Sequence, residues 1–300
     1  MIEINGVNKS FGSLKALDNI VATIQEGSIF GLVGTNGAGK STLLRILSGV
    51  LKADTGSALV DGEDVYENPS AKGKVCFLSD TAYFFPNATI QTMEEYYAIV
   101  YPGFNRERFD ELTEKFGLSK KRKINSFSKG MKKQVSVLLG ICTGTKYLLC
   151  DETFDGLDPV MRQAVKSIFA LELMNRQFTP VIASHSLREL EDICDHVGLL
   201  HQGGILLSKD LEDMKFHIHK VQCVIPDPAK EEELLTELHV LQHEKRGSLL
   251  TVVARGTRQE ILMSIEDKQP IFSEVLPLTL EEIFISETEV AGYDVKNIVF

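Results

Sequence analysis

The chain has 300 residues, which is enough for about two domains with separate cores. Its composition, 43% hydrophobic and 25% charged, is typical of a globular protein, and its net charge of -10 excludes a general nucleic-acid binder, which needs a basic surface. No apolar run reaches the ~20 residues of a membrane span, and the first residues are unlike a signal peptide. We therefore expect a cytosolic chain.

The first half of the chain predicts strands that enter and leave a glycine-rich loop. Alternating or apolar runs predict strands over 2–7, 20–24, 29–33, 56–60 and 75–78. The stretch 87–144 changes character: Thr89 and Ser128 can cap helices, and Gly117 can end a third one over 106–116. We interpret 87–144 as a helical insertion between two strand-rich halves.

The second half alternates strands with helices up to about residue 215. Strands are predicted over 147–150 and 181–183, helices over 159–175 and 187–194, and a hairpin over 197–207. This alternation predicts an α/β fold with a largely parallel sheet. Five cysteines sit mostly in apolar segments, so we predict reduced core thiols: Cys76, Cys142, Cys150, Cys194 and Cys223.

Residues 216–300 predict a separate α+β domain. Their order of strands and helices, β-α-β-β-α-β followed by a helix, suggests a small ferredoxin-like unit. His239 and His243 are four residues apart and would form a metal pair if they shared a helix face. With no third ligand nearby, surface histidines are the favoured interpretation.

The glycine-rich loop over 34–42 reads Gly-Thr-Asn-Gly-Ala-Gly-Lys-Ser-Thr and fits the phosphate-binding pattern G-x-x-x-x-G-K-[ST]. A buried strand precedes it and an amphipathic helix follows it, which is the context that the pattern requires. Lys40 would bind the β- and γ-phosphates, and the Ser41 hydroxyl would bind Mg²⁺. The predicted nucleotide-binding residues of this loop are Asn36, Gly37, Ala38, Gly39, Lys40, Ser41 and Thr42.

A second chemical element is the apolar run 147–150, which ends in Asp151 and Glu152. Both carboxylates would lie at the carboxyl edge of the sheet, where open α/β sheets bind ligands. Asp151 would hold Mg²⁺, and Glu152 would act as the general base on an attacking water. Without the loop, a solvated strand end would be the simpler interpretation.

Three further motifs lie between and after these two. Ser128 and Gly130 begin a helix and form a second anion site, which one nucleotide does not need, so a second chain would bring them to the γ-phosphate. His185 is a candidate γ-phosphate sensor, although an isolated histidine would be read as a strand-end residue. Asp158 is a candidate for contact between the two sites.

Together these motifs resemble the nucleotide-binding domain of ATP-binding cassette (ABC) transporters over about residues 1–215. The motifs that carry the resemblance are Phe11, the loop 34–42, the signature 128–131, Asp151-Glu152, 156–158 and His185. The resemblance implies that Phe11 stacks on adenine and that two cassettes close over two ATP molecules, driving a separate integral-membrane permease. It also implies a peripheral position on the cytoplasmic face of a bacterial membrane.

The chain departs from that pattern at several positions. Asp80 replaces the usual glutamine that links nucleotide to the membrane partner, and we retain it as a candidate Mg²⁺ ligand. Lys129 and Met131 replace the usual glycine and glutamine of the signature, and 153–155 replace Pro-Thr-Ser. The signature form, the aromatic run 83–86 and the run 280–285 are similar to ABC-2 exporters, including exporters of amphipathic or antimicrobial peptides.

Two alternatives remain open from the residues. A soluble ABC protein of translation or DNA maintenance would resemble a two-cassette chain or carry long coiled coils, and this chain has neither. A regulatory subunit with little turnover is disfavoured by Glu152 and His185 but left open by Asp80 and Lys129.

Overall fold

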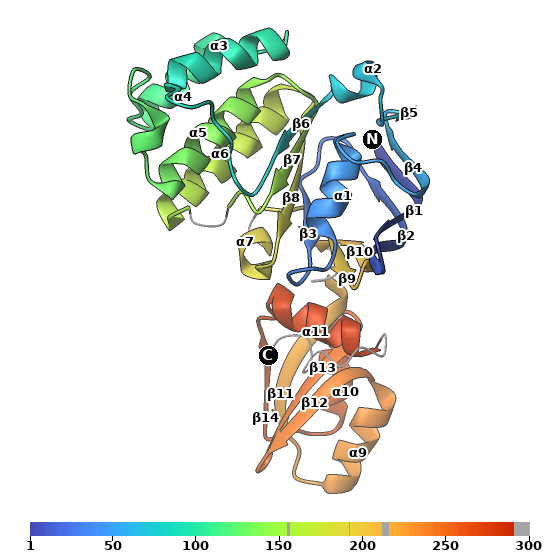
Figure 1. Ribbon diagram of the computed structural model, residues 1–300. Helices are drawn as coiled ribbons and strands as arrows, with labels where there is room; N and C mark the ends of the chain where they lie inside the picture. Colours follow the sequence, from blue (N-terminus) through green and yellow to red (C-terminus); the bar gives the residue numbers. More distant parts are fainter. Residues whose placement is uncertain (155–156, 192, 212–215, 291–300) are drawn as a thin grey trace. The chain divides into compact units, whose positions relative to one another are not determined.

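The computed structural model describes residues 1–154, 157–191, 193–211 and 216–290. The chain forms two compact units, Met1–Ser208 and Lys209–Phe300, whose elements are labelled in Figure 1. The sequence predicted a boundary after residue 215.

An antiparallel sheet forms one layer of the first unit, in the order β2-β1-β4-β5. Its strands are β1 (Ile2–Phe11), β2 (Leu14–Ile24), β4 (Thr55–Val60) and β5 (Glu63–Asp64). The sequence indicated only the outer parts of β1 and β2, at 2–7 and 20–24. The inner parts were missed because the pairing shifts register between Val7 and Ser10, which interrupts the alternation of apolar and polar residues.

A six-stranded sheet forms the second layer, in the order β10-β9-β3-β8-β7-β6. Its strands are β3 (Phe30–Val33), β6 (Val75–Leu78), β7 (Tyr147–Asp151), β8 (Thr179–Ser184), β9 (His196–His201) and β10 (Gly204–Asp210). The pairs β6/β7, β7/β8, β3/β8 and β3/β9 are parallel, which confirms the predicted parallel sheet. Every residue of β3, β7 and β8 is buried, as expected of strands covered on both faces.

Helix α1 (Lys40–Leu47) lies between the two sheets (Figure 1). Its apolar face joins residues of both sheets in one core, which includes Leu44 of the helix together with Ile4, Val60 and Leu149 of the sheets. Each such side chain contributes about 1.5–3 kcal/mol when it is fully buried. This core holds the start of α1 rigidly against the carboxyl ends of the parallel strands. The short helix α2 (Pro69–Lys72) begins at Asn68, which caps it.

The helices of the predicted insertion begin where the capping residues stand. They are α3 (Ile90–Val100), α4 (Arg106–Lys115), the 3-10 turn Ile124–Ser126 and α5 (Lys129–Cys142). Thr89 forms a capping box with α3, Ser128 Oγ accepts a hydrogen bond from Met131 N at 3.2 Å, and Gly117 has a φ of 63° after α4. In Figure 1 these helices, with α6 (Pro159–Asn175), lie on the opposite side of the six-stranded sheet from α1.

The second unit is a four-stranded antiparallel sheet in the order β12-β13-β11-β14. Its elements are β11 (Ile218–Val224), α9 (Pro228–Glu237), β12 (His239–Arg246), β13 (Leu249–Arg255), α10 (Arg258–Asp267), β14 (Phe272–Leu276) and α11 (Leu280–Val290). The predicted element order is therefore confirmed, and its strands take the ferredoxin-like arrangement 2-3-1-4. Leu234 of α9 and Ile265 of α10 are buried against the apolar side of the sheet.

His239 and His243 lie on β12, not on a helix, so the interpretation as a helical metal pair is wrong. Four residues along a strand span about 13 Å, which is too far for one ion. Both side chains are exposed, as expected of surface histidines. All five cysteines are free and buried, and burial raises the pKa of Cys76 and of Cys223 to about 11. Among the described helices, none combines the length and apolarity that a bilayer crossing requires.

Candidate nucleotide-binding site

The loop between β3 and α1 is folded around the ammonium group of Lys40. The Lys40 side chain is only 4% exposed, and its Nζ donates hydrogen bonds to Gly34 O at 2.7 Å and Thr35 O at 3.1 Å. These carbonyls hold the cation inside the loop at the positive end of α1. The loop therefore presents a buried positive charge and the positive end of a helix to any anion that enters.

Neighbouring segments of the same chain leave no room for side chains at two glycines of this loop. Gly39 has a φ of 108°, and a Cβ there would lie 2.5 Å from Ala16 O. A Cβ at Gly34 would lie 2.4 Å from Leu200 O. Only glycine fits both positions, because the second strand and the β9 end pack directly against the loop.

Ser41 and Asp151 meet where α1 faces the end of β7. Ser41 Oγ donates a hydrogen bond to Asp151 Oδ1 at 3.0 Å, and Asp151 is 1% exposed. Asp151 Oδ2 is buried without a hydrogen-bond partner. Burial raises the pKa of Asp151, and the nearby Asp80 carboxylate adds to the rise. A carboxylate held in this way destabilises the folded chain unless a cation or a donor reaches Oδ2.

We expect Asp151→Asn to raise the melting temperature of the nucleotide-free protein by roughly 2–4 °C, or about 1 kcal/mol, at neutral pH. Asn keeps the acceptor for Ser41 and removes the buried charge. Because the folded-state pKa of Asp151 is raised, the wild-type protein loses stability as the pH rises through that pKa. The gain should therefore shrink in acid, where Asp151 is protonated.

Thermal melts at several pH values measure this difference. Asp18→Asn, at a side chain that is 52% exposed, is the matched control and should change little. A lower melting temperature for Asp151→Asn at neutral pH would contradict the expectation.

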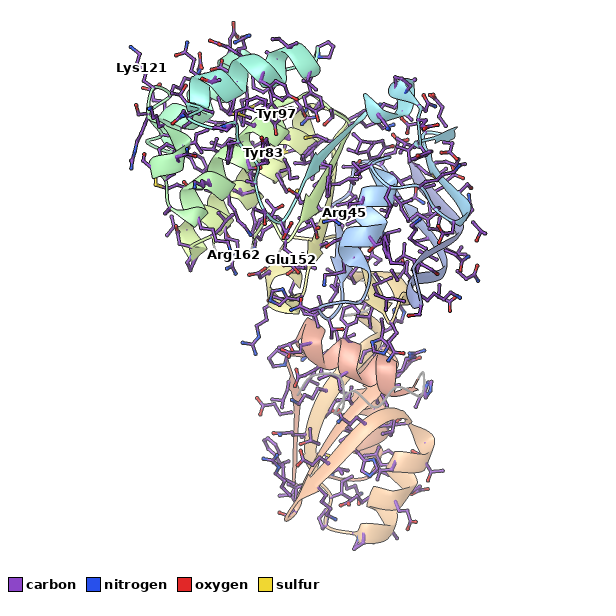
Figure 2. The ribbon with its side chains drawn as sticks, in the orientation of Figure 1. Arg45, Tyr83, Tyr97, Lys121, Glu152 and Arg162 are labelled. Carbon is purple, nitrogen blue, oxygen red and sulfur yellow. The ribbon has the colours of Figure 1, made fainter. Side chains whose placement is uncertain are left out.

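Glu152, labelled in Figure 2, follows β7. Its backbone is in a left-handed conformation with a φ of 47°. Such a conformation costs a non-glycine residue about 1–3 kcal/mol, so its surroundings must hold it. Glu152 N donates to Ala183 O at 3.0 Å, and Lys133 Nζ donates to Glu152 O at 2.6 Å. Its Oε1 lies 3.7 Å from His185 Nδ1, and both side chains are partly open to solvent.

Asp80 and Phe11 lie in exposed segments at the ends of their strands. Asp80 follows β6, whose Leu78 pairs with Cys150 of β7, so Asp80 is at the same sheet edge as Asp151. Phe11 ends β1 and is 49% exposed, with Lys9 Nζ 5.7 Å from its ring centroid.

Ser128, Gly130 and Asp158 stand at two helix starts. Asp158 Oδ1 accepts a hydrogen bond from Met161 N at 3.0 Å and caps α6, as Ser128 caps α5. The structure thus gathers the loop, Asp151, Glu152 and His185 along one sheet edge, while Ser128 and Gly130 belong to the helices opposite α1 (Figure 1). Gly156, which belongs to the 156–158 motif of the sequence analysis, lies outside the described residues.

Sequence reasoning missed several residues that hold these groups. Arg162 Nη2 pairs with Glu189 Oε1 at 3.2 Å, and Ser184 Oγ donates to Glu189 Oε2 at 3.1 Å. This chain of contacts joins α6, which follows Asp158, to α7 (Leu187–Glu191), which follows His185. No sequence pattern pairs α6 with α7, because the contact depends on how the two helices pack.

Lys133, also missed, is 6% exposed on α5. One signal was available, since Lys133 falls at helical spacing with the buried residues Val137 and Gly140. A lysine on the buried face of a helix needs a polar partner, and here the partner is Glu152 O.

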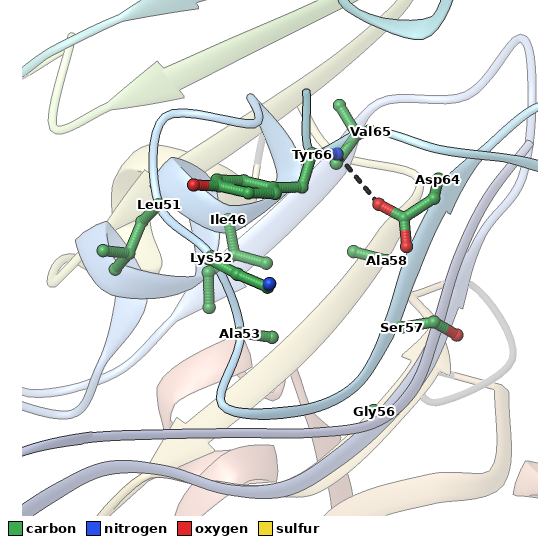
Figure 3. Close-up of a pocket in the computed structure, with 10 residues that line it drawn as sticks. All are labelled: Ile46, Leu51, Lys52, Ala53, Gly56, Ser57, Ala58, Asp64, Val65 and Tyr66. Carbon is green, nitrogen blue, oxygen red and sulfur yellow. Dashed lines mark hydrogen bonds between the residues drawn. The ribbon is translucent and has the colours of Figure 1, made fainter. Parts of the chain in front are cut away.

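A pocket of about 270 Å³ lies elsewhere, beside the end of α1 (Figure 3). Tyr66 forms one wall, with Lys52 Nζ 5.5 Å from its ring centroid, and Tyr66 N donates to Asp64 Oδ1 at 2.9 Å. Its lining residues are Ile46, Leu51, Lys52, Ala53, Gly56, Ser57, Ala58, Asp64, Val65 and Tyr66. None of these ten residues belongs to the predicted nucleotide site.

The fold and the site define a phosphate-loop ATPase: a glycine loop and lysine at a helix start, facing a strand that ends in two acids. The family model described as ABC transporter matches residues 17–155. The uncharacterized ABC transporter ATP-binding protein YdbJ of Bacillus subtilis is 30% identical over 96% of this chain and 95% of its own length. The chain therefore belongs to the ATP-binding subunits of ABC transporters.

Two further similarities agree with this assignment. The bacitracin transport ATP-binding protein BcrA of Bacillus licheniformis is 28% identical over 72% of this chain and 71% of its own length. The solved dimeric structure of the ATP-binding cassette MJ0796 bound to ADP and Pi covers 70% of this chain and 99% of its own, with a TM-score of 0.63 and 20% identity. At that identity the structure supports the fold.

Proposed function

We propose that this chain hydrolyses ATP as the nucleotide-binding subunit of a bacterial exporter, paired with a second cassette and bound to a permease at the cytoplasmic face of the membrane. The observation that carries the proposal is the assembly at one sheet edge of Lys40, the Ser41–Asp151 pair and the Glu152–His185 pair. These groups come from three separate segments, the start of α1, the end of β7 and the end of β8, and ATP hydrolysis explains why all of them converge.

Each side chain has a step in the reaction. The phosphates replace the carbonyls of Gly34 and Thr35 as partners of Lys40, while Phe11 stacks on adenine. Glu152 accepts the proton of the attacking water, and His185, 3.7 Å from it, binds the γ-phosphate and holds it in line.

The residues fit Mg²⁺. Asp151 Oδ2 is buried without a partner beside the Ser41 hydroxyl, and carboxylate and hydroxyl oxygens are the ligands that Mg²⁺ prefers. Ser41 and Asp151 would hold the ion, with Asp80 at the same edge. When bound, Mg²⁺ would neutralise charge on the phosphate oxygens.

A second cassette would complete the site. Ser128 and Gly130 begin α5 on the opposite side of the sheet from α1, so their anion site suits the nucleotide of another subunit. Because each ATP would contact two subunits, its binding energy would close them, and hydrolysis would release them. Asp158, at the start of α6, would lie between the two sites.

The transported substrate is proposed to be an amphipathic or antimicrobial peptide. The similarity to a protein named for bacitracin transport and the ABC-2 form of the signature support this. The permease would contact the aromatic run after Asp80, in which Tyr83, labelled in Figure 2, lies. The Tyr83 side chain is 73% exposed.

The proposal is tested by co-expressing the chain with its permease, extracting the membranes with detergent and purifying the permease. The chain should co-purify, and the complex should hydrolyse ATP only with Mg²⁺. If the chain binds no permease, the proposed coupling to transport is refuted. If the complex shows no Mg²⁺-dependent turnover of ATP, the proposed hydrolysis is refuted.

A further inference from the structure

A buried contact joins the signature helix to the residue that we propose as the general base. Lys133 Nζ donates to Glu152 O at 2.6 Å, and Lys133 is 6% exposed. Lys133 lies on α5, the helix that Ser128 caps, whereas Glu152 follows β7. The contact therefore connects two parts of the site that are remote in sequence.

This contact fixes the conformation of Glu152. Its φ of 47° is a left-handed conformation that glutamate does not favour. Its N–H is held by Ala183 O at 3.0 Å and its C=O by Lys133, so both peptide groups that flank Cα are anchored. With the backbone anchored on both sides, the carboxylate is aimed at the place where Oε1 lies 3.7 Å from His185 Nδ1.

We propose that Lys133 is a positioning residue for ATP hydrolysis: through the Glu152 carbonyl it holds the general base in its active geometry and links that base to the signature helix. The inference rests on the proposed function. Ser128 would contact the nucleotide of the other subunit, and Glu152 acts on the nucleotide of its own. Lys133 would therefore couple the two sites: binding of a nucleotide at Ser128 of the signature helix would affect the position of Glu152 in the other site.

Lys133→Met, which keeps an unbranched apolar stem and removes the donor, should lower kcat for ATP about 10- to 100-fold, because a small displacement of a catalytic group costs that much. The KM for ATP should change little, since the loop and Lys40 are untouched. The dependence of the rate on ATP concentration should also become less cooperative. Lys133→Arg, which restores a cation and donors, should recover most of the rate.

Lys132→Met, the adjacent lysine on α5, is the matched control and should keep the parent rate. Thermal melts check that each variant folds. Hydrogen exchange of the nucleotide-free chain gives a readout that needs no activity: the amides around Glu152 should exchange faster in Lys133→Met than in Lys132→Met.

Unchanged kcat and unchanged exchange in Lys133→Met would overturn the inference. The inference would also be overturned if Lys133→Met lost kcat, ATP affinity and ATP-driven dimerisation to the same extent, because that result would indicate a general structural role for Lys133. If the parent chain and Lys132→Met hydrolyse no ATP, the proposed function fails, and the exchange comparison still decides whether Lys133 holds Glu152.

Discussion

Glu152→Gln should reduce ATP turnover by roughly 100- to 10,000-fold, the contribution typical of a general base, while leaving ATP binding intact. Glutamine has the same shape but accepts no proton at neutral pH. The Lys40 loop and the Ser41–Asp151 pair are unaffected, so ATP should still enter and the two proposed subunits should still close. The variant should therefore accumulate as an ATP-bound dimer, which size-exclusion chromatography with nucleotide measures.

Glu114→Gln is the matched control for this experiment. Glu114 is an exposed residue of α4, so its substitution should preserve both turnover and the monomer–dimer balance. Parent-level turnover in Glu152→Gln would show that another group accepts the proton. A variant that stays monomeric with saturating ATP, even beside its permease, would remove the basis for the shared site.

Mixing two inactive variants should restore activity, because we propose that each ATP site draws on two subunits. Lys40→Met removes the cation that grips the phosphates, and Ser128→Asp places a negative charge against the γ-phosphate while still capping α5. Each variant alone should be nearly inactive. In an equal mixture of two copies of this chain, half of the dimers keep one intact site, so about one quarter of the parent rate should return.

Ser128→Asn caps the helix equally well without the charge and should keep most of the activity, which separates the electrostatic effect from the loss of a cap. Counting bound ATP is a second readout, and unlike the rate it does not depend on whether the two sites cooperate. In the Glu152→Gln background, mixed dimers should enclose one ATP each between their subunits, and the single variants should enclose none. No recovery in either measurement would place Ser128 outside the ATP site.

Local patterns were sufficient for most elements and for the chemistry of the loop. Thr89 and Ser128 cap the predicted helices, since capping depends on a side chain and an amide three residues away. The six parts of the ferredoxin-like unit were also predictable, because each has its own period. The β1–β2 hairpin was only half predicted, because its bulges break that period.

The sequence alone determined which groups we propose for the ATP site: the glycine loop with Lys40 and Ser41, and the acid pair at the end of an apolar strand. Spacing along the chain carries that information, because each motif is formed within a few residues. Only the tertiary structure decided how these groups are held. Lys133 reaches the Glu152 carbonyl across 19 positions of sequence, and Arg162 reaches Glu189 between helices. Such contacts depend on the packing of whole elements, which no local pattern encodes.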